Sequence, residues 1–251
     1  MTRAWFLSLG LLAVSPGIVS AQAIDTTPEV PAPATGSAHV IRLYHIAAAA
    51  AGLSLLMMLD QPVQRYAIDN SGPGADNVAS TVRHYGQPEV YGTVTLGLLA
   101  AGLATGNPSI TRSGGRLAAS LLLAGVTTEL GKEMLGRPRP EQSLDSDGFD
   151  PFSGQVSFPS GHTAMSFALA TSLADDIHRP LASVGLYGMA TAVGWSRIND
   201  NRHWLSDVAA GALVGITSAK LVSGRWRIFG LKPPSFLIAP GMAGLNWHAQ
   251  F

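Results

Sequence analysis

The sequence contains no cysteine and few charged residues. Without cysteine, disulfides, thiolate metal sites and a cysteine nucleophile are excluded. Asp, Glu, Lys and Arg make up only 13% of the 251 residues, about half the usual share in a soluble domain. The formal net charge is zero, so the composition gives no support to a nucleic acid or other polyanionic partner. Apolar residues reach 47%, enough for one sizeable hydrophobic core.

Two of the chain's apolar windows are shorter than a bilayer span requires. Spanning a bilayer takes about 20 consecutive apolar residues. The window Leu117–Thr128 stops at Glu129, and the window Thr163–Ala174 stops at Asp175. Short windows favour an exported globular bundle, whereas the low charge content and the basic connections between helices favour a membrane bundle. The sequence leaves both alternatives open.

The first 23 residues are typical of a secretory signal peptide. The apolar run Ala4–Val14 is followed by small residues suited to cleavage near Ala21. The alternative is an uncleaved membrane anchor, but the run is short and is interrupted by Pro16-Gly17, which favours cleavage. We therefore expect a signal peptide over residues 1–23 and a flexible Pro/Ala-rich linker over residues 24–39.

Residues 40–230 predict an all-α domain, a bundle of about six helices. The apolar stretches behind this prediction are Leu43–Leu59, Val90–Thr105, Leu117–Leu135, Thr163–Ile177, Leu181–Ser196 and Asp207–Val222. Turn signals such as Asn107-Pro108 and Gly114-Gly115 separate them. Residues 231–251 form a C-terminal extension, in which two short strands around Pro240-Gly241 predict a β-hairpin.

The first of three stretches that carry chemistry contains two cations. Lys132 lies near the end of a predicted helix, and Arg139 follows a turn stiffened by proline. Both side chains are long enough to reach one anion. The simpler interpretation is that cations gather at a helix C-terminus because the helix dipole favours them there. Taken alone, this stretch favours the simpler interpretation.

The second stretch is Ser160-Gly161-His162, directly before a predicted helix. Ser160 suits the N-cap position, and Gly161 lets an anion approach the backbone. The free amides and the dipole at a helix start can bind phosphate, and His162 would face the same cavity. The alternative, a capping serine beside a surface histidine, is the commoner case for such a motif on its own.

The third stretch pairs His203 with Asp207, four residues apart. On a helix this spacing places both on one face. The carboxylate can then accept the Nδ1 proton of the histidine, which leaves Nε2 free as a nucleophile. Arg197, in the preceding connection, can give a bidentate grip on phosphate. The alternative is an ordinary surface pair. However, three unrelated surface features in the three stretches would not be expected all to be features that phosphoryl transfer requires.

Together the stretches spell Lys-x6-Arg-Pro, Pro-Ser-Gly-His and Ser-Arg-x5-His-x3-Asp. This pattern resembles that of the type 2 phosphatidic acid phosphatases, which share a superfamily with bacterial nonspecific acid phosphatases and vanadium haloperoxidases. The resemblance covers about Leu117 to Val222. The matching positions are Lys132, Arg139, Pro140, Pro159, Ser160, Gly161, His162, Ser196, Arg197, His203 and Asp207.

The residues and the resemblance imply the same two-step mechanism. His203 attacks phosphorus and forms a phosphohistidine, while His162 protonates the leaving alkoxide and then takes a proton from water. Asp207 orients His203. The phosphate oxygens are held by three cations, a hydroxyl and an amide, from Lys132, Arg139, Arg197, Ser160 and Gly161. Neither a metal nor a cofactor is expected, and vanadate would bind as an inhibitor or adventitious ligand.

Two further features lie close to this set in the sequence. Arg137 and Arg202 are candidates for supporting the site, ranked below the catalytic residues. The acidic loop Glu141–Phe158 is either a lid that shapes substrate choice or an ordinary solvated loop, and the second is favoured.

The expected substrate is a phosphorylated lipid or a small phosphomonoester. Phosphatidate, phosphatidylglycerophosphate, undecaprenyl diphosphate and lipid A phosphates all fit the cage, and lipid is favoured if the bundle is in a membrane. The alternatives are a soluble periplasmic acid phosphatase, a vanadium haloperoxidase and a non-catalytic relative. Export places the protein in the bacterial periplasm, either soluble or associated with the inner membrane with its active site facing the periplasm. Nothing in the sequence indicates an oligomeric state.

Overall fold

The computed structural model describes residues 38–230, 235–239 and 242–246. The predicted signal peptide and the linker up to residue 37 lie outside the described residues. Among the described residues, the chain divides into two units, one within Ala38–Pro233 and a second that contains residues 235–239 and 242–246.

The first unit is helical, which confirms the predicted all-α class. Its helices are α1 (Leu43–Met57), α2 (Asp60–Asp69), α3 (Pro73–Arg83), the 3₁₀ turn η1 (His84–Gly86), α4 (Pro88–Thr105), α5 (Pro108–Leu135), α6 (Gly161–Ile177), α7 (Pro180–Asn199) and α8 (Leu205–Val222). The six predicted apolar stretches correspond to α1 and to α4 through α8.

Helices α2 and α3 were not predicted, because they carry few apolar residues. The buried side chains of α2 are Asp60 and Gln64, and α3 buries only Ala79. Polar contacts hold α2 in place, since the Gln64 side-chain amide donates to Asn201 Oδ1 at 3.0 Å. A search for apolar periodicity misses a helix that is anchored in this way.

The prediction of a turn at Gly114-Gly115 is wrong, because α5 runs through both residues. The helix begins after Asn107, whose side chain accepts from the Ser109 amide at 3.0 Å and caps it. A Cβ at Gly114 would lie 2.9 Å from Leu99 Cγ. The glycine is therefore needed for the close approach of α4 and α5 and does not end the helix.

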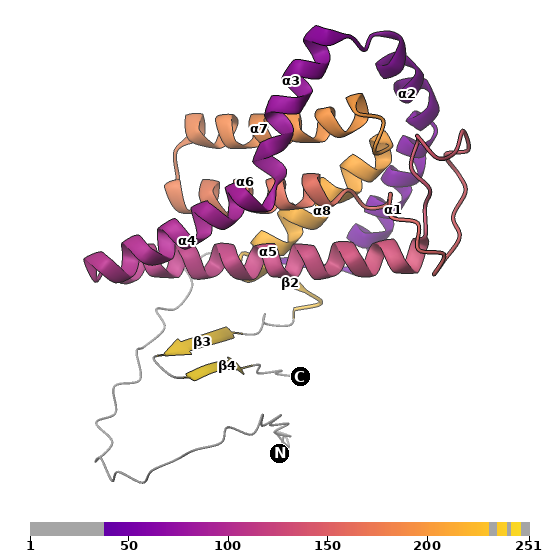
Figure 1. Ribbon diagram of the computed structural model, residues 1–251. Coiled ribbons are helices and arrows are strands. Elements are labelled where there is room, and N and C mark those ends of the chain that lie inside the picture. Colours follow the sequence, from indigo (N-terminus) through magenta and orange to yellow (C-terminus); the bar gives the residue numbers. More distant parts are fainter. Residues whose placement is uncertain (1–37, 231–234, 240–241, 247–251) are drawn as a thin grey trace, which may run out of the picture. The chain divides into compact units, whose positions relative to one another are not determined.

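The core is built around α6, which contacts α5, α7 and α8. In Figure 1 the long helix α5 runs along one side of this bundle. Small residues let α6 and α8 approach closely: Ala164 and Ala168 are fully buried, and a Cβ on Gly215 would lie only 2.3 Å from the Ala164 carbonyl oxygen. This tight contact fixes the N-terminal ends of α6 and α8 next to each other.

Two short β-pairs complete the described chain. The strand β1 (His39–Ile41) pairs in parallel with β2 (Trp226–Ile228), a contact too short to predict from sequence. In the second unit, β3 (Ser235–Ala239) pairs antiparallel with β4 (Met242–Asn246). This pairing confirms the predicted hairpin, although its turn at residues 240–241 lies outside the described residues.

One described helix, α8, is by itself long and apolar enough to cross a membrane. Helices α1 and α2 meet the same criterion only as a pair bent by 46°. The outer faces of the bundle nevertheless carry large apolar side chains in the open. On α5 these include Leu122, which is 62% exposed, together with Leu130 and Met134. The exposed face of α5 is therefore more apolar than the face that a helix usually turns toward water.

Candidate active site

The three sequence stretches meet at one place in the structure. The Ser160 amide donates to the Asp207 carbonyl at 3.0 Å, which joins the second stretch to the third. The Trp204 indole donates to the Pro138 carbonyl at 3.0 Å, which joins the third to the first. A Cβ placed on Gly161 would lie 3.6 Å from Lys132 Nζ, so the first and second stretches are also adjacent.

Lys132 projects from the last turn of α5. The helix ends at Gly136, whose φ of 55° lies in the left-handed region and whose Cβ would collide with the Asp150 carbonyl. Only glycine fits such a position. The Lys132 ammonium lies 2.6 Å from Glu129 Oε1, one turn earlier on the same helix.

Ser160 occupies the N-cap position of α6, but its side chain makes no capping hydrogen bond. Its hydroxyl is fully buried and accepts from Thr163 Oγ1 at 3.0 Å. Capping through this hydroxyl, the basis of the sequence argument, is therefore not what the structure shows. Since Ser160 does not use them, the first amides of α6 remain available to an anion beside Gly161 and His162.

His203 and Asp207 are adjacent, although not on one helix as the spacing suggested. His203 lies in the turn before α8, and Asp207 lies in the first turn of α8. The distance from His203 Nδ1 to Asp207 Oδ2 is 3.5 Å, longer than a normal hydrogen bond. Among the described residues Nδ1 has no other hydrogen-bond partner. The carboxylate thus faces the correct ring nitrogen, at a distance that a small shift of the ring would close.

Arg197 lies in the last turn of α7 rather than in the connection that follows it. Its carbonyl accepts from the amides of Arg202 and His203 at 3.0 and 3.2 Å. The turn that carries His203 is therefore folded back onto the end of α7. This brings the Arg197 side chain and the His203 ring to the same side of the bundle.

Asp207 is held by a buried network whose central member is Arg137. The Arg137 guanidinium is fully buried and lies 2.6 Å from both Asp207 Oδ1 and Asp60 Oδ2. Its carbon also lies 5.2 Å from the Phe149 ring centre and 5.5 Å from that of Trp204. Arg137, ranked only as a supporting residue from sequence, is the counter-ion that fixes the Asp207 carboxylate.

Sequence reasoning missed Asp60 altogether. This residue lies in α2, a helix that was not predicted, and it also accepts from the Ser206 amide at 2.8 Å. Its partner Arg137 is 77 positions away in the sequence. The one signal that could have identified Asp60 is its position as a charged residue directly after the apolar stretch Leu43–Leu59.

Most residues of the loop Glu141–Phe158 are exposed or half-buried, as a solvated loop would be, but two of its serines are part of the site. The Ser146 carbonyl accepts from Arg137 Nε at 2.9 Å, and Ser157 Oγ donates to Asp207 Oδ2 at 2.6 Å. Both serines are buried. The loop is therefore part of the wall that supports Asp207, and the preference for a solvated loop is wrong at these positions.

The two histidines have lowered pKa values. Burial, followed by the charges of Arg197, His203, Lys132 and Arg139, lowers the pKa of His162 to about 4. Burial also lowers the pKa of His203, against the opposing effect of the Asp207 carboxylate. In the protein alone both rings are therefore neutral at neutral pH. A phosphate dianion among the same cations would raise the pKa of His162, because it would favour the charged ring.

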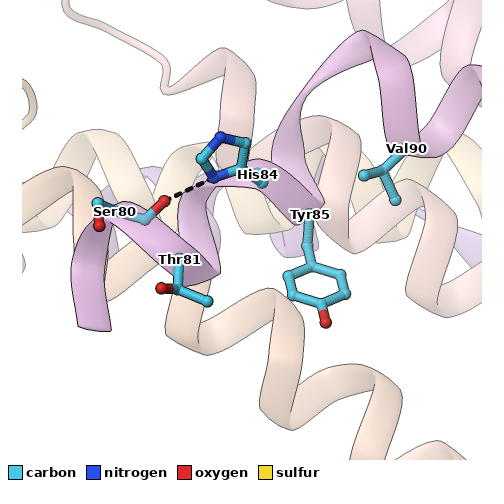
Figure 2. A pocket seen from close by; sticks show the side chains of 5 residues that line it. All are labelled: Ser80, Thr81, His84, Tyr85 and Val90. Carbon is cyan, nitrogen blue, oxygen red and sulfur yellow. Dashed lines mark hydrogen bonds between the residues drawn. The ribbon is translucent and has the colours of Figure 1, made fainter. Parts of the chain in front are cut away.

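Two hollows in the described surface lie outside this cluster. One, of about 390 Å³, is lined by Ser80, Thr81, His84, Tyr85 and Val90, none of which belongs to the three stretches. Figure 2 shows that His84 turns toward Ser80, where its Nδ1 donates to the Ser80 carbonyl at 2.6 Å. This histidine is therefore hydrogen-bonded to the preceding helix, α3.

The second hollow is a groove of about 500 Å³ on α5. Its lining residues are Leu121, Leu122, Gly125, Val126, Glu129, Leu130, Glu133 and Met165. Most of these lining residues are apolar, and one of them, Glu129, forms an ion pair with Lys132. Within residues 38–230 and the two strands of the hairpin, no group of three or more His, Cys, Asp or Glu side chains is arranged to hold a metal ion.

Comparison with known proteins gives related sequences and related folds. Residues 113–227 match the PAP2 superfamily. Lipid A 1-phosphatase of Porphyromonas gingivalis is 40% identical over 111 residues, which cover 43% of this chain and 22% of that protein. Lipid phosphate phosphatase 2 of Arabidopsis thaliana is 33% identical over 132 residues, which cover 40% of this chain and 46% of that protein. Non-specific acid phosphatase of Salmonella typhi is 40% identical over 79 residues, 32% of this chain and 28% of that protein. The chain thus spans less than half the length of these relatives.

Two solved structures share the fold. The crystal structure of Aquifex aeolicus LpxE superposes with a TM-score of 0.54 at 23% identity, over 65% of this chain and 94% of that chain. The crystal structure of the first transmembrane PAP2 type phosphatidylglycerolphosphate phosphatase from Bacillus subtilis gives a TM-score of 0.55 at 18% identity, over 72% and 96%. At these identities the likeness supports the helical architecture alone.

Proposed function

Because residues 113–227 belong to the PAP2 superfamily, we propose that this protein is a metal-independent phosphatase that acts on a lipid-linked phosphomonoester or diphosphate through a phosphohistidine. The observation that carries the proposal is the surroundings of His162. A Cβ on the preceding Gly161 would lie 3.6 Å from Lys132 Nζ, and the Ser160 amide donates to the Asp207 carbonyl at 3.0 Å. The nearby charges of Arg197, Lys132 and Arg139 also lower the pKa of His162. One histidine among three cations and beside a second histidine is the arrangement that metal-free phosphoryl transfer requires.

In the first step, Nε2 of neutral His203 attacks phosphorus while the bond to the leaving oxygen breaks. His162 gives its proton to that oxygen, and the phosphate remains on His203. In the second step, His162 takes a proton from water as the water oxygen attacks phosphorus, and His203 leaves as the neutral ring. Asp207, fixed by Arg137, stabilises the positive charge on His203 in the intermediate.

The cations take the part that a metal ion plays in other phosphoryl-transfer enzymes. Lys132, Arg139 and Arg197 face the charge that spreads over the equatorial oxygens in the transition state. The free amides at the start of α6 add donors at fixed positions. We expect Ser160 and Gly161 to complete this cage.

The groove on α5 supports a lipid substrate. Its mostly apolar lining includes Glu129, whose carboxylate lies 2.6 Å from Lys132 Nζ, so an apolar chain in the groove would lie close to a cation of the cage. The exposed apolar side chains of α5 fit a position against a membrane. Two of the relatives are named for lipid phosphates. We therefore propose an exported protein associated with the inner membrane, with its site facing the periplasm.

A soluble acid phosphatase is the second candidate, because the relative from Salmonella typhi is named a non-specific acid phosphatase. Fractionation separates the two. If membranes washed with carbonate retain the protein, and that fraction hydrolyses lipid phosphates faster than p-nitrophenyl phosphate, the lipid assignment holds. Release of the protein by the wash, with preference for the soluble ester, contradicts it. Halide oxidation with added vanadate tests the haloperoxidase alternative, and we expect none.

A further inference from the structure

Two carboxylates at the candidate site are each shared between two arginines. Asp200 Oδ2 lies 2.8 Å from Arg197 Nη1 and 3.3 Å from Arg83 Nη1. Glu141 Oε1 lies 2.5 Å from Arg202 Nη1 and 3.8 Å from Arg139 Nη1. In each case one arginine, Arg197 or Arg139, belongs to the phosphate cage. The other, Arg83 or Arg202, is not a fixed position of any of the three motifs and is more exposed to solvent than the cage arginine.

A carboxylate that contacts a cage arginine competes with phosphate for it. When Arg197 turns to a bound phosphate, Asp200 loses its 2.8 Å partner, and its side chain is only 17% exposed. A carboxylate left in this position without a cation is costly, because little water reaches it. Arg83 removes most of this cost, since it already contacts the same oxygen.

The third cage cation provides an internal comparison. Lys132 is also paired with a carboxylate, that of Glu129, but this carboxylate contacts no second cation among the described residues. Its side chain is 69% exposed, so water can solvate it once Lys132 turns away. Asp200 and Glu141, at 17% and 32% exposed, have a second arginine where Glu129 has solvent.

We propose that Arg83 and Arg202 are positioning residues that hold Asp200 and Glu141 while Arg197 and Arg139 bind the phosphate. This inference rests on the proposed function and assigns a role to residues that are not fixed positions of the three motifs. It gives each carboxylate a purpose: Asp200 and Glu141 hold the cage arginines before substrate arrives, and they weaken the grip on the phosphate product. The five cations of these pairs face three carboxylates, so two positive charges remain for a phosphate dianion.

The test is a double-mutant cycle on Arg83 and Asp200 in the full-length protein. Binding of inorganic phosphate is measured by calorimetry and by competitive inhibition, and KM and kcat on one substrate are measured separately. We expect Arg83→Met to weaken phosphate binding and raise KM by roughly 3-fold to 10-fold, with kcat nearly unchanged, because it leaves Asp200 bound to Arg197. Asp200→Asn should tighten phosphate binding by a similar factor.

The double variant decides whether Arg83 acts through Asp200. With Asp200→Asn in place there is no carboxylate to hold, so we expect Arg83→Met to have little further effect on phosphate binding. An undiminished effect would show that Arg83 attracts phosphate directly and would overturn the inference. Arg112→Met, at an exposed position of α5, is the matched control for loss of one positive charge.

The other pair and the wild type complete the design. The same cycle on Arg202 and Glu141 should have the same sign and a smaller size, because Glu141 lies 3.8 Å from Arg139. Circular dichroism shows that each variant is folded. If the wild type binds phosphate and the Arg83 and Asp200 variants bind it equally well, the inference fails while the proposed function stands. If the wild type does not bind phosphate at all, both fail.

Discussion

Arg137 is paired with two buried carboxylates, Asp60 and Asp207, of which only Asp207 faces a catalytic residue. Replacing each in turn therefore distinguishes an effect on protein stability from an effect on catalysis. Both carboxylates lie 2.6 Å from the guanidinium, and all three side chains are fully buried. Replacing either carboxylate by an amide leaves Arg137 paired with the other carboxylate but removes a buried hydrogen bond between charged groups, which typically costs about 1–3 kcal/mol. We expect Asp60→Asn and Asp207→Asn each to lower the unfolding free energy by about this amount, equivalent to a fall in Tm of roughly 2–12 °C.

The two variants should differ in turnover. Only Asp207 faces His203, so Asp207→Asn should reduce kcat by about 10³–10⁴-fold, as loss of the carboxylate that orients a catalytic histidine does elsewhere. Asp60→Asn leaves Arg137 bound to Asp207 and should keep kcat within about tenfold at temperatures where the variant is folded. Circular dichroism in denaturant gives the stability, and initial rates on p-nitrophenyl phosphate give kcat.

Asp69→Asn, at an exposed position in the last turn of α2, is the matched control and should change neither quantity. A stability loss below about 1 kcal/mol for Asp60→Asn would contradict the importance assigned to the network. A loss of activity as large as that of Asp207→Asn would show that Asp60 takes a direct part in the chemistry.

Four further outcomes are expected. His162→Ala should abolish turnover of alkyl phosphates but still release one equivalent of p-nitrophenol from p-nitrophenyl phosphate in a burst, because that leaving group needs no proton. Stopped-flow absorbance measures the burst. Absence of a burst argues against His162 as the general acid. Burial and the cations lower the pKa of His162 to about 4 in the protein alone, so its proton is lost as pH rises and kcat/KM should be highest in acid and fall toward neutral pH. The corresponding limb of kcat should lie at higher pH because bound phosphate raises that pKa; a wild-type kcat/KM profile that His162→Ala leaves unchanged contradicts this assignment. Dialysis against EDTA should leave activity intact, and recovery only on adding a divalent cation would refute metal independence. Gly215→Ala should destabilise the bundle by about 1–3 kcal/mol, because its Cβ would lie 2.3 Å from the Ala164 carbonyl, whereas Gly188→Ala, with open space around it, should not; equal melting temperatures would contradict the packing described for α6 and α8.

The helices that carry the three motifs could be predicted from sequence because they are apolar. Helices α2 and α3 could not, since they are held by polar contacts such as Gln64 with Asn201, which leave no periodic pattern. Gly114 and Gly115 show the opposite error, a turn that was predicted where α5 continues. Gly114 resembles a turn in the sequence, and only the position of Leu99 shows that it is a packing residue.

The motif residues could be identified because phosphoryl transfer constrains their types and spacing. Their supports could not. Asp60 and Arg83 come from the two unpredicted helices, and their partners Arg137 and Asp200 lie far away in the sequence. Such pairs become visible only when the fold brings the charges together. Likewise, the lowered pKa of His162 depends on how deeply α6 is buried, which a local motif does not encode.

The most direct measurement is to locate the covalent phosphate. The His162→Ala variant is mixed with p-nitrophenyl phosphate and quenched in alkali, which preserves phosphohistidine, and its peptides are mapped by mass spectrometry. We expect a single phosphate on the peptide that carries His203, and none when His203 is also replaced by alanine. Phosphate on any other side chain, or a phosphorylated peptide that survives replacement of His203, would contradict the nucleophile on which the proposed mechanism depends.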